Sequence, residues 1–249
     1  MSKTMWKARK PFAVALLMLC FVPAQAAEMA LMPFSAARTD LVPAPWRVVG
    51  VPGGKIPLTS FSVADLEGRK VLRVTASRSY GNLVHDLPPT IPAAGVRLSW
   101  RWRLDVALKG TDLHTRQGDD SPLKVCVLLD MPLEKLGLIE RNLMRFARAA
   151  SAEKLPSATL CYVWDDKLSL DTLLPNAYTD RVRMIVVTSG SAALGAWVAQ
   201  SRDVVADFRR AFGAESDSLP PMMAVLVGAD ADNTGGHSMG FVDDVRLER

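Results

Sequence analysis

A loop near the C-terminus carries the side chains whose spacing most clearly predicts chemistry. Asp230, Asp232 and Thr234 alternate with other residues and are followed by a glycine, which is the order of oxygen ligands in a calcium-binding loop. An EF-hand is excluded because its twelfth position, which requires glutamate, is Phe241. Asp243 could supply a further oxygen from the following strand. The competing interpretation is a polar turn whose side chains bond their own backbone.

A second acidic feature is the pair Asp119 and Asp120, which follows a glycine in a polar segment. Paired carboxylates at a strand end suit a metal ion, a sugar hydroxyl or acid-base catalysis, whereas the alternative is an ordinary turn. The chain has no G-x-S-x-G motif and no histidine or cysteine spacing typical of zinc. We therefore assign no catalytic residue, and a glycan hydrolase or lyase using these carboxylates stays an alternative.

Four tryptophans divide into two groups by their position in the pattern. Trp100 and Trp102 share one face of a predicted strand with aliphatic residues, which predicts burial in the core. Trp164 and Trp197 lie near predicted strand ends, where an aromatic ring can stack on a sugar. The second pair is therefore predicted to contribute to ligand binding.

Arginines form a row on the opposite face of the same strand. Arg97, Arg101 and Arg103 alternate with the apolar residues, and Arg181 and Arg183 extend the row from another strand if the two are neighbours. Such a row suits an acidic polysaccharide or a lipid head group. The alternative is a solvated sheet face with ion pairs across strands.

Two cysteines could report whether the protein works in an oxidising compartment. Cys126 and Cys161 lie in apolar, strand-like segments that could be neighbours. In an oxidising compartment they could form a disulfide, and otherwise they are two buried thiols that pack as small apolar residues.

The elements that must position these residues are mostly strands. Apolar residues alternate with charged ones over 96–106, and a nearly continuous apolar run covers 123–129. Similar short segments predict about nine or ten strands in all, and prolines 88, 89 and 92 predict a loop. Helices do not alternate regularly with the strands. The sequence therefore predicts a mainly β protein, an antiparallel β-sandwich of the jelly-roll-like kind.

Two helices interrupt the strands. Residues 133–150 place apolar side chains on one helical stripe and arginines off it, which predicts an inserted amphipathic helix of about 18 residues. We expect the stripe to cover an open face of the sandwich, with a membrane surface as the alternative. Residues 203–212 predict a short helix that ends at Gly213.

Many of these segments, in the same order, resemble one bacterial family. It is catalogued as a domain of unknown function, the 3047 family (DUF3047), and the resemblance covers nearly all of the chain after residue 26. It implies export and a single domain but no established activity. The segments are 98–102, 118–120, 158–164, 176–183, 195–198, 202–208, 212–213 and 230–235.

The C-terminal segment 240–247 carries a second, shorter resemblance. It is similar to the closing strand of jelly-roll carbohydrate-binding modules, with an aromatic residue, an acidic pair and aliphatic residues. In those modules an acidic residue of this strand commonly helps to hold a structural calcium ion, which implies that role for Asp243.

The N-terminus predicts export. Residues 1–26 combine four basic residues, the apolar run 12–22 and the small-x-small sequence Ala24-Gln25-Ala26, as in a cleavable signal peptide. The apolar run is shorter than the ~20 residues of a membrane-spanning helix, although an uncleaved anchor is the alternative. An N-terminal arm, 27–45, and a single sandwich domain, 46–249, are expected to follow.

Removal of the signal peptide changes the charge. The whole chain has 30 basic and 26 acidic residues, and all four basic residues of the signal peptide would be lost, which leaves a neutral protein without the charge of a nucleic-acid binder. The function that fits best is non-catalytic binding of a cell-envelope saccharide by a periplasmic or secreted protein. A structural or protein-interaction module is a further alternative.

Overall fold

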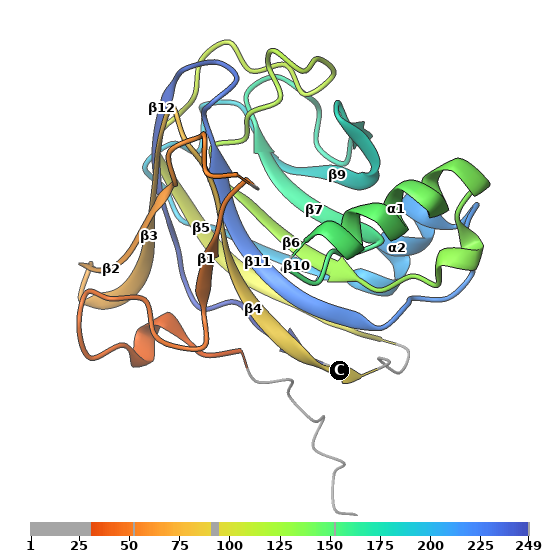
Figure 1. The fold of residues 1–249 in the computed structure, drawn as a ribbon. Helices are drawn as coiled ribbons and strands as arrows, with labels where there is room; N and C mark the ends of the chain where they lie inside the picture. The colour runs from red at the N-terminus through yellow and green to blue at the C-terminus, as the bar shows by residue number, and fades with distance from the viewer. Residues whose placement is uncertain (1–30, 52, 91–94, 152, 249) are drawn as a thin grey trace, which may run out of the picture.

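Two facing β-sheets make up the protein in the computed structural model (Figure 1), which describes residues 31–51, 53–90, 95–151 and 153–248. The predicted signal peptide, residues 1–26, and the start of the predicted arm lie outside the described residues. The rest of the arm includes a 3-10 helix, Phe34–Ala36, whose Phe34 is buried against Trp46. The arm therefore completes the core and does not merely lead into it.

The larger sheet has seven strands, and the predicted strands supply most of it. All neighbouring strands are antiparallel except β7 and β9, which are parallel, so the predicted antiparallel sandwich is confirmed with one exception. Strand β8 was not predicted. The order across the sheet is β1(Arg47–Val49), β4(Tyr80–Thr90), β11(Met222–Asp230), β6(Lys124–Leu129), β7(Ala158–Asp165), β9(Thr179–Ser189) and β8(Leu173–Asn176).

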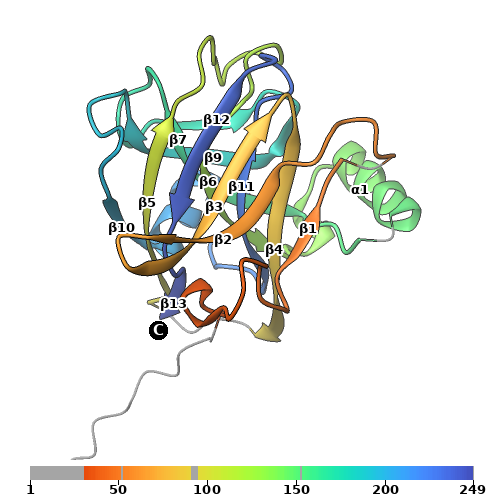
Figure 2. The ribbon, with the colours of Figure 1, turned by 90° about the vertical axis from the view of Figure 1, so that its left-hand side faces the viewer.

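The smaller sheet faces the viewer in Figure 2. Its order is β10(Val198–Asp203), β5(Arg97–Val106), β12(His237–Val242), β3(Arg69–Ser77) and β2(Ser60–Leu66), and β13(Arg246–Glu248) also pairs with β5. The closing strand predicted over 241–247 is therefore two strands. Both lie along β5, and the chain leaves the sheet between them at residues 243–245.

The core lies between the sheets, and β5 shows why. Its alternation points Leu98, Trp100, Trp102 and Leu104 inward, and all four are buried, as predicted. Trp102 contacts Trp164 of the other sheet, and its indole N–H donates to the Thr188 hydroxyl at 3.0 Å. Burial of such large aromatic side chains is a major stabilising contribution.

The larger sheet is also covered on its outer face. A second apolar cluster there includes Cys126, Cys161, Met184 and Leu226, with Leu113 packed over them from the polar segment. Cys126 and Cys161 are directly opposite each other on β6 and β7 and are joined by a disulfide. Of the two alternatives open from the sequence, the structure therefore shows the bridge.

Two local predictions were wrong. Strand β4 continues through Pro88 and Pro89, where a loop was expected. A register shift in the pairing with β11 lies opposite these prolines, between Met222 and Ala224, and an irregular ladder tolerates residues that lack an N–H. The helix predicted over 133–150 is a 3-10 turn, Leu133–Lys135, followed by α1(Leu138–Ala150).

The second helix is confirmed as α2(Val204–Phe212). Asp203 caps its first turn by accepting hydrogen bonds from the backbone N–H groups of Val205 and Ala206. No helix in the described part of the chain is long and apolar enough to cross a membrane.

Candidate functional site

A groove of about 440 Å³ crosses the outer face of the smaller sheet. Its volume falls within the range of small-ligand sites. Hydroxyl, carboxylate and guanidinium groups supply six of the nine lining side chains, whereas the Gln200 amide donates inward to Val187 and Thr188 of the other sheet. The lining residues are Arg69, Ser99, Trp100, Arg101, Ala199, Gln200, Asp243, Asp244 and Arg246.

The break between β12 and β13 shapes this groove. Ser99 and Arg101 lie on the outward face of β5, opposite the core tryptophans. Where β12 ends, the backbone N–H of Asp243 still donates to the Arg101 carbonyl at 2.9 Å, and β13 then brings Arg246 opposite Ser99. Strand β10 places Ala199 beside Arg101 on the other side. The groove therefore has strand backbone as its floor and charged side chains above it.

Asp243 is neutralised by two arginines. Its buried carboxylate accepts hydrogen bonds from Arg101 and forms an ion pair with Arg69 at 3.2 Å. Burial opposes ionisation, but the Arg101 hydrogen bonds and the nearby Arg69 charge outweigh it and lower the pKa of Asp243. The second carboxylate of the groove, Asp244, accepts bonds from the backbone N–H and hydroxyl of Ser35.

The guanidinium groups are the part of the groove left open to a ligand. Arg101 also stacks on Trp197, with 5.3 Å from its central carbon to the ring centroid, and the Trp197 indole N–H donates to Glu67 at 3.1 Å. The Arg246 guanidinium forms no hydrogen bond or ion pair with any residue in the described part of the chain. The groove therefore presents net positive charge and free donors.

The acidic residues predicted as sites converge elsewhere, between the end of β11 and the segment before β6. Asp120 accepts hydrogen bonds from the backbone N–H groups of Asn233 and Thr234, at 3.2 and 2.6 Å, and from the Thr234 hydroxyl. Asp120 therefore ties residues 233–234 to the neighbouring loop. This favours the turn interpretation that the sequence left open.

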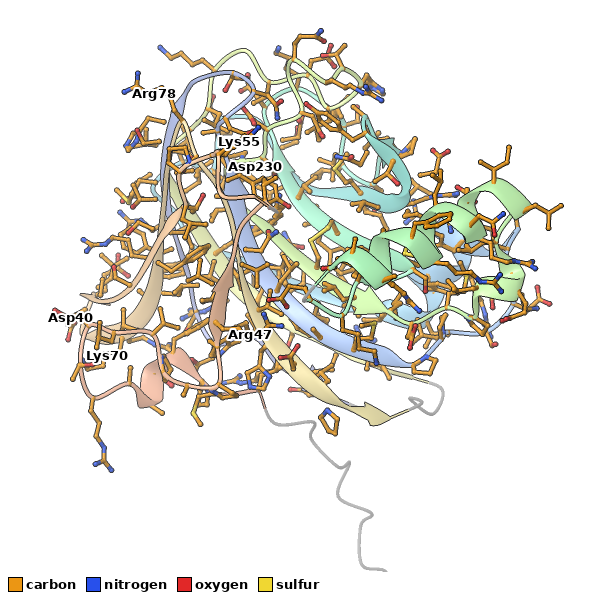
Figure 3. All side chains as sticks on the ribbon, in the orientation of Figure 1. Asp40, Arg47, Lys55, Lys70, Arg78 and Asp230 are labelled. Atoms are coloured by element: carbon orange, nitrogen blue, oxygen red, sulfur yellow. A yellow bond between two sulfur atoms is a disulfide. The ribbon has the colours of Figure 1, made fainter. Side chains whose placement is uncertain are left out.

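Asp230 lies at the end of β11 (Figure 3) and pairs with a buried lysine. The Lys124 ammonium is 2.8 Å from Asp230 Oδ2 and 5.1 Å from the centre of the Tyr80 ring. Burial alone would lower the pKa of Lys124, but Asp230 and Tyr80 reverse that effect and raise it. Gly228 leaves room for the lysine stem, since a Cβ there would lie 2.9 Å from Lys124 Cε.

Asp119 is buried beside Asp230 and Asp120 and accepts a hydrogen bond from the Asn176 amide. Burial raises the pKa of Asp119 to about 6, and the charge of Asp230 adds to this despite the opposing bond from Asn176. Burial and the charge of Asp120 likewise raise the pKa of Asp232. Both carboxylates are thus destabilised when ionised.

We expect Asp119→Asn to stabilise the protein at pH 7.5 by about 1–2 kcal/mol, after allowance for solvent screening. Because the folded-state pKa is raised from 3.8 to about 6, the folded wild type binds this proton more tightly than the unfolded chain does. Its stability should therefore fall as pH rises from about 4 to 6 and stay low above that range. Urea unfolding at pH 7.5 and pH 4 measures the difference. An equal gain at both pH values would contradict the assignment.

The four residues predicted as calcium ligands are not gathered around one point. Asp230 binds Lys124, Asp232 lies near the charges of Asp120 and Asp230, the Thr234 hydroxyl donates to Asp120, and Asp243 binds Arg101 in the groove. Among the described residues, no group of three or more histidine, cysteine, aspartate or glutamate side chains is arranged to hold a metal ion.

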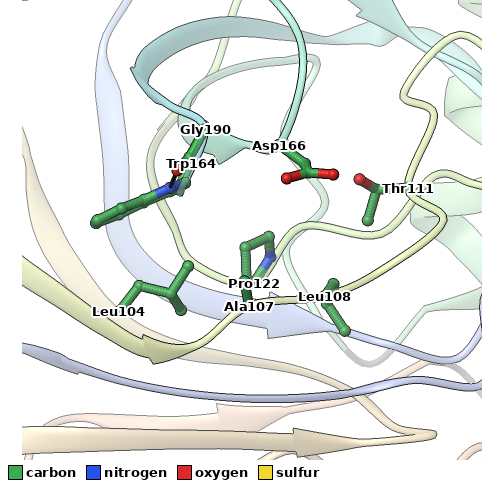
Figure 4. Close-up of a pocket in the computed structure, with 8 residues that line it drawn as sticks. All are labelled: Leu104, Ala107, Leu108, Thr111, Pro122, Trp164, Asp166 and Gly190. Carbon is green, nitrogen blue, oxygen red and sulfur yellow. Dashed lines mark hydrogen bonds between the residues drawn. The ribbon is translucent and has the colours of Figure 1, made fainter. Parts of the chain in front are cut away.

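Of the two tryptophans predicted to bind ligand, only Trp197 lies beside the groove. Trp164 is buried, donates its indole N–H to the Gly190 carbonyl, and borders a cavity of about 10 Å³ together with Leu104 and Asp166 (Figure 4). That space holds no more than a water molecule, so Trp164 is a core residue.

The predicted row of arginines is divided between the sheets. Arg103 pairs with Asp105 and Glu67 in the smaller sheet. Arg181 and Arg183, from β9 of the larger sheet, both pair with Glu215, which follows α2. Arg97 donates to Ser201 on the neighbouring strand. The ion pairs of Arg103, Arg181 and Arg183 are thus made with their own strand, a turn or a loop and not across paired strands, and Arg101 is the one member of the row that lines the groove.

Sequence reasoning missed several groove residues. Ser99 was placed on the correct strand face by its alternation with Trp100, but nothing marked it as part of a site. Arg69 and Arg246 come from strands β3 and β13, and only the completed sheet brings them together. Only the order of the strands in the sheet shows that these residues are neighbours.

The sequence profile of a family described as "Protein of unknown function (DUF3047)" matches residues 44–246. No curated protein matches the chain significantly in sequence.

Several solved structures resemble the chain. A family 11 carbohydrate-binding module of a cellulosomal cellulase from Clostridium thermocellum is 10% identical with a TM-score of 0.42, covering 90% of this chain and 95% of the module. The cleaved adhesin domain of Lys-gingipain from Porphyromonas gingivalis is 13% identical with a TM-score of 0.40, and the match covers 90% of this chain and 99% of that domain. Endoglucanase 3 of Trichoderma harzianum, from family GH12, is 8% identical with a TM-score of 0.39, and the match covers 83% of this chain and 99% of the endoglucanase.

Proposed function

The chain belongs to the family described as Protein of unknown function (DUF3047), and from that premise we propose that it is an exported protein that binds an acidic saccharide without catalysis. The observation that carries the proposal is the groove on the smaller sheet, with net positive charge at its surface. Export is supported by the pattern of residues 1–26. The disulfide between Cys126 and Cys161 is also typical of an oxidising compartment.

The chemistry of the groove favours an acidic sugar over an apolar ligand. Six of its nine lining side chains carry a hydroxyl, carboxylate or guanidinium group, which suits hydroxyl-rich molecules. The carboxylates of Asp243 and Asp244 already have partners, whereas Arg246 and the exposed part of Arg101 keep donors available. Guanidinium groups bind carboxylates strongly because two parallel N–H donors match two oxygens.

Trp197 is a positioning residue in this proposal. The Arg101 guanidinium lies over its ring, and its own N–H donates to Glu67. This differs from the stacking role that the sequence suggested, because Arg101 already lies over one ring face.

We expect Arg246→Gln to weaken binding of hexagalacturonate about ten-fold, the loss of one charge-assisted hydrogen bond. Binding is measured by isothermal titration at physiological salt, so that long-range charge effects are screened. The matched control is Arg73→Gln, which removes the same charge from the same sheet outside the groove, where Arg73 bonds only Ser62 among the described residues. The methyl ester of the oligosaccharide should bind weakly. Equal binding of the ester, or equal loss in the control, would contradict the proposal.

One observation favours a second function, a glycan hydrolase that uses Asp119. A carboxyl whose pKa is about 6 can serve as a general acid near neutral pH. Against this, Asp120 is occupied by donors from residues 233–234 and is not available as its partner. Release of reducing ends from the same oligosaccharide, abolished by Asp119→Asn, would establish hydrolysis and overturn the non-catalytic assignment.

A further inference from the structure

Helix α1 exposes the face that its sequence pattern predicts to be buried. Leu138, Ile139, Leu143 and Phe146 are between 63% and 78% exposed. Figures 1 and 2 show the helix at the periphery of the larger sheet, with no other element of the described chain on its far side. The expectation that this stripe covers the sandwich is therefore wrong.

The opposite face of α1 is the one that contacts the protein, and its contacts are mostly polar. Arg141 donates to the carbonyl oxygens of Leu133, Glu134 and Leu136, at 2.8–3.1 Å. Arg148 donates to the Leu155 carbonyl and to the Asp130 carboxylate at 2.8 Å.

These contacts fix how the helix is turned. Met144 packs against the main core between the two arginines, and Glu140 forms an ion pair with Arg181 at 3.4 Å. Rotation of α1 to bury its apolar stripe would break the hydrogen bonds of both arginines and the Glu140–Arg181 ion pair. The contacts of α1 with the rest of the protein therefore hold its apolar stripe toward solvent.

The charge beside the stripe is positive. Arg145, on the flank of the stripe, and Lys135, just before the helix, are exposed and form no ion pair with any described residue. Glu153 is paired with Arg47, and Glu134 is the one acidic side chain of 133–154 that lacks an ionic partner among the described residues. An apolar stripe flanked by free basic groups complements the surface of a membrane with anionic lipids.

A second copy of the chain fits this face less well. A helix of 13 residues is about 20 Å long and about 10 Å wide, so its contact footprint is on the order of 200 Å². A stable protein interface needs about 800 Å² from each partner. A bilayer has no such requirement, because it takes up each apolar side chain individually.

We propose that α1 binds the surface of an anionic phospholipid bilayer, with its axis parallel to the membrane plane and its apolar stripe inserted. The contact holds the sandwich at the membrane and leaves the groove on the other sheet accessible. The proposal concerns a different face from the saccharide groove, so either can fail without the other.

The test is flotation of residues 27–249, which hold every described helix and strand, with phosphatidylglycerol-containing vesicles. Substitution of Ile139, Leu143 and Phe146 by serine should reduce the bound fraction at least about ten-fold. The matched control replaces three similarly exposed leucines elsewhere by serine, Leu41, Leu58 and Leu170, and should bind like the wild type. The charge variant Lys135→Glu, Arg145→Glu should also lose binding, and vesicles of pure phosphatidylcholine should bind more weakly than anionic ones.

Three outcomes would overturn the proposal. One is the absence of binding to anionic vesicles. Another is equal loss in the three-leucine control, which would show a general hydrophobic effect. The third is a dimer, measured by analytical ultracentrifugation, that dissociates in the serine variant, because that result assigns the stripe to a second copy. Circular dichroism of the serine variant should match the wild type, since the substituted side chains are exposed.

Discussion

Asp230→Asn is expected to lower the free energy of unfolding by about 3–5 kcal/mol, because it leaves the buried Lys124 ammonium without its anion. The substitution keeps an oxygen that can accept from the Ser121 backbone N–H, a bond of 2.9 Å in the wild type. The loss therefore reports the ion pair and not the loop connection. Urea unfolding at neutral pH measures it.

The control for this prediction removes the second charge as well. Lys124→Met in the Asp230→Asn background leaves no unpaired charge, and its methionine can pack in the space of the lysine stem beside Tyr80. We expect the double variant to recover most of the lost stability. A double variant as unstable as Asp230→Asn would show that the carboxylate matters through packing or the loop and not through Lys124.

Removal of the disulfide is the second large effect. Replacement of Cys126 and Cys161 by alanine should reduce stability by about 3–4 kcal/mol, the chain-entropy expectation for a closed loop of this length. The two residues are 35 positions apart, and the bridge lies across the adjacent central strands β6 and β7. Urea unfolding measures the change.

A reductant supplies the control for the disulfide. Wild type with its bridge reduced should unfold at the same urea concentration as the alanine variant treated identically, apart from a small packing difference. If reductant leaves the wild type unchanged, the bridge does not contribute to stability in solution.

The sequence predicted those elements whose structure depends mainly on residues close together in the chain, through strand alternation, apolar runs or helix capping. The alternation on β5 identified the strand and the buried side of Trp100 and Trp102, because a half-buried strand has no other arrangement. The nearly continuous apolar run 123–129 likewise indicated a buried strand, and it forms β6. Asp203 caps the first turn of α2 as N-terminal capping chemistry requires, and the helix ends at Phe212, just before Gly213, as predicted.

The failures came from specific polar contacts, which the periodicity of apolar residues does not encode. The stripe of α1 has the pattern of a core-facing helix, but three carbonyl acceptors around Leu133–Leu136 hold Arg141 on the inner side. The apolar pattern alone does not reveal whether the apolar face or the arginine-bearing face of α1 makes the more favourable contacts with the rest of the protein. Nothing in the apolar run 123–129 marked its one charged residue, Lys124, as part of an ion pair, because its anion, Asp230, is 106 positions away.

The candidate site shows the same division. The sequence identified Asp119, Asp120 and the loop beginning at Asp230 as separate features, and the structure brings them together through bonds spanning more than 100 positions. Their roles differ from those expected, since they hold two loops together. The groove is formed by strands β3, β5, β10 and β13 and the segment between β12 and β13. Of its lining residues, Arg101 and Asp243 had been considered as site residues, and Trp197 lies beside it.

The most direct test of the central claim is a backbone amide chemical-shift titration with hexagalacturonate. We predict perturbations confined to the groove, with Ser99, Ala199 and Asp244 among the largest, and their loss in Arg246→Gln. Perturbation centred on Asp119, Asp120 and residues 230–234, or no perturbation at concentrations that saturate other acidic-sugar binders, would contradict the assignment of the groove as the binding site.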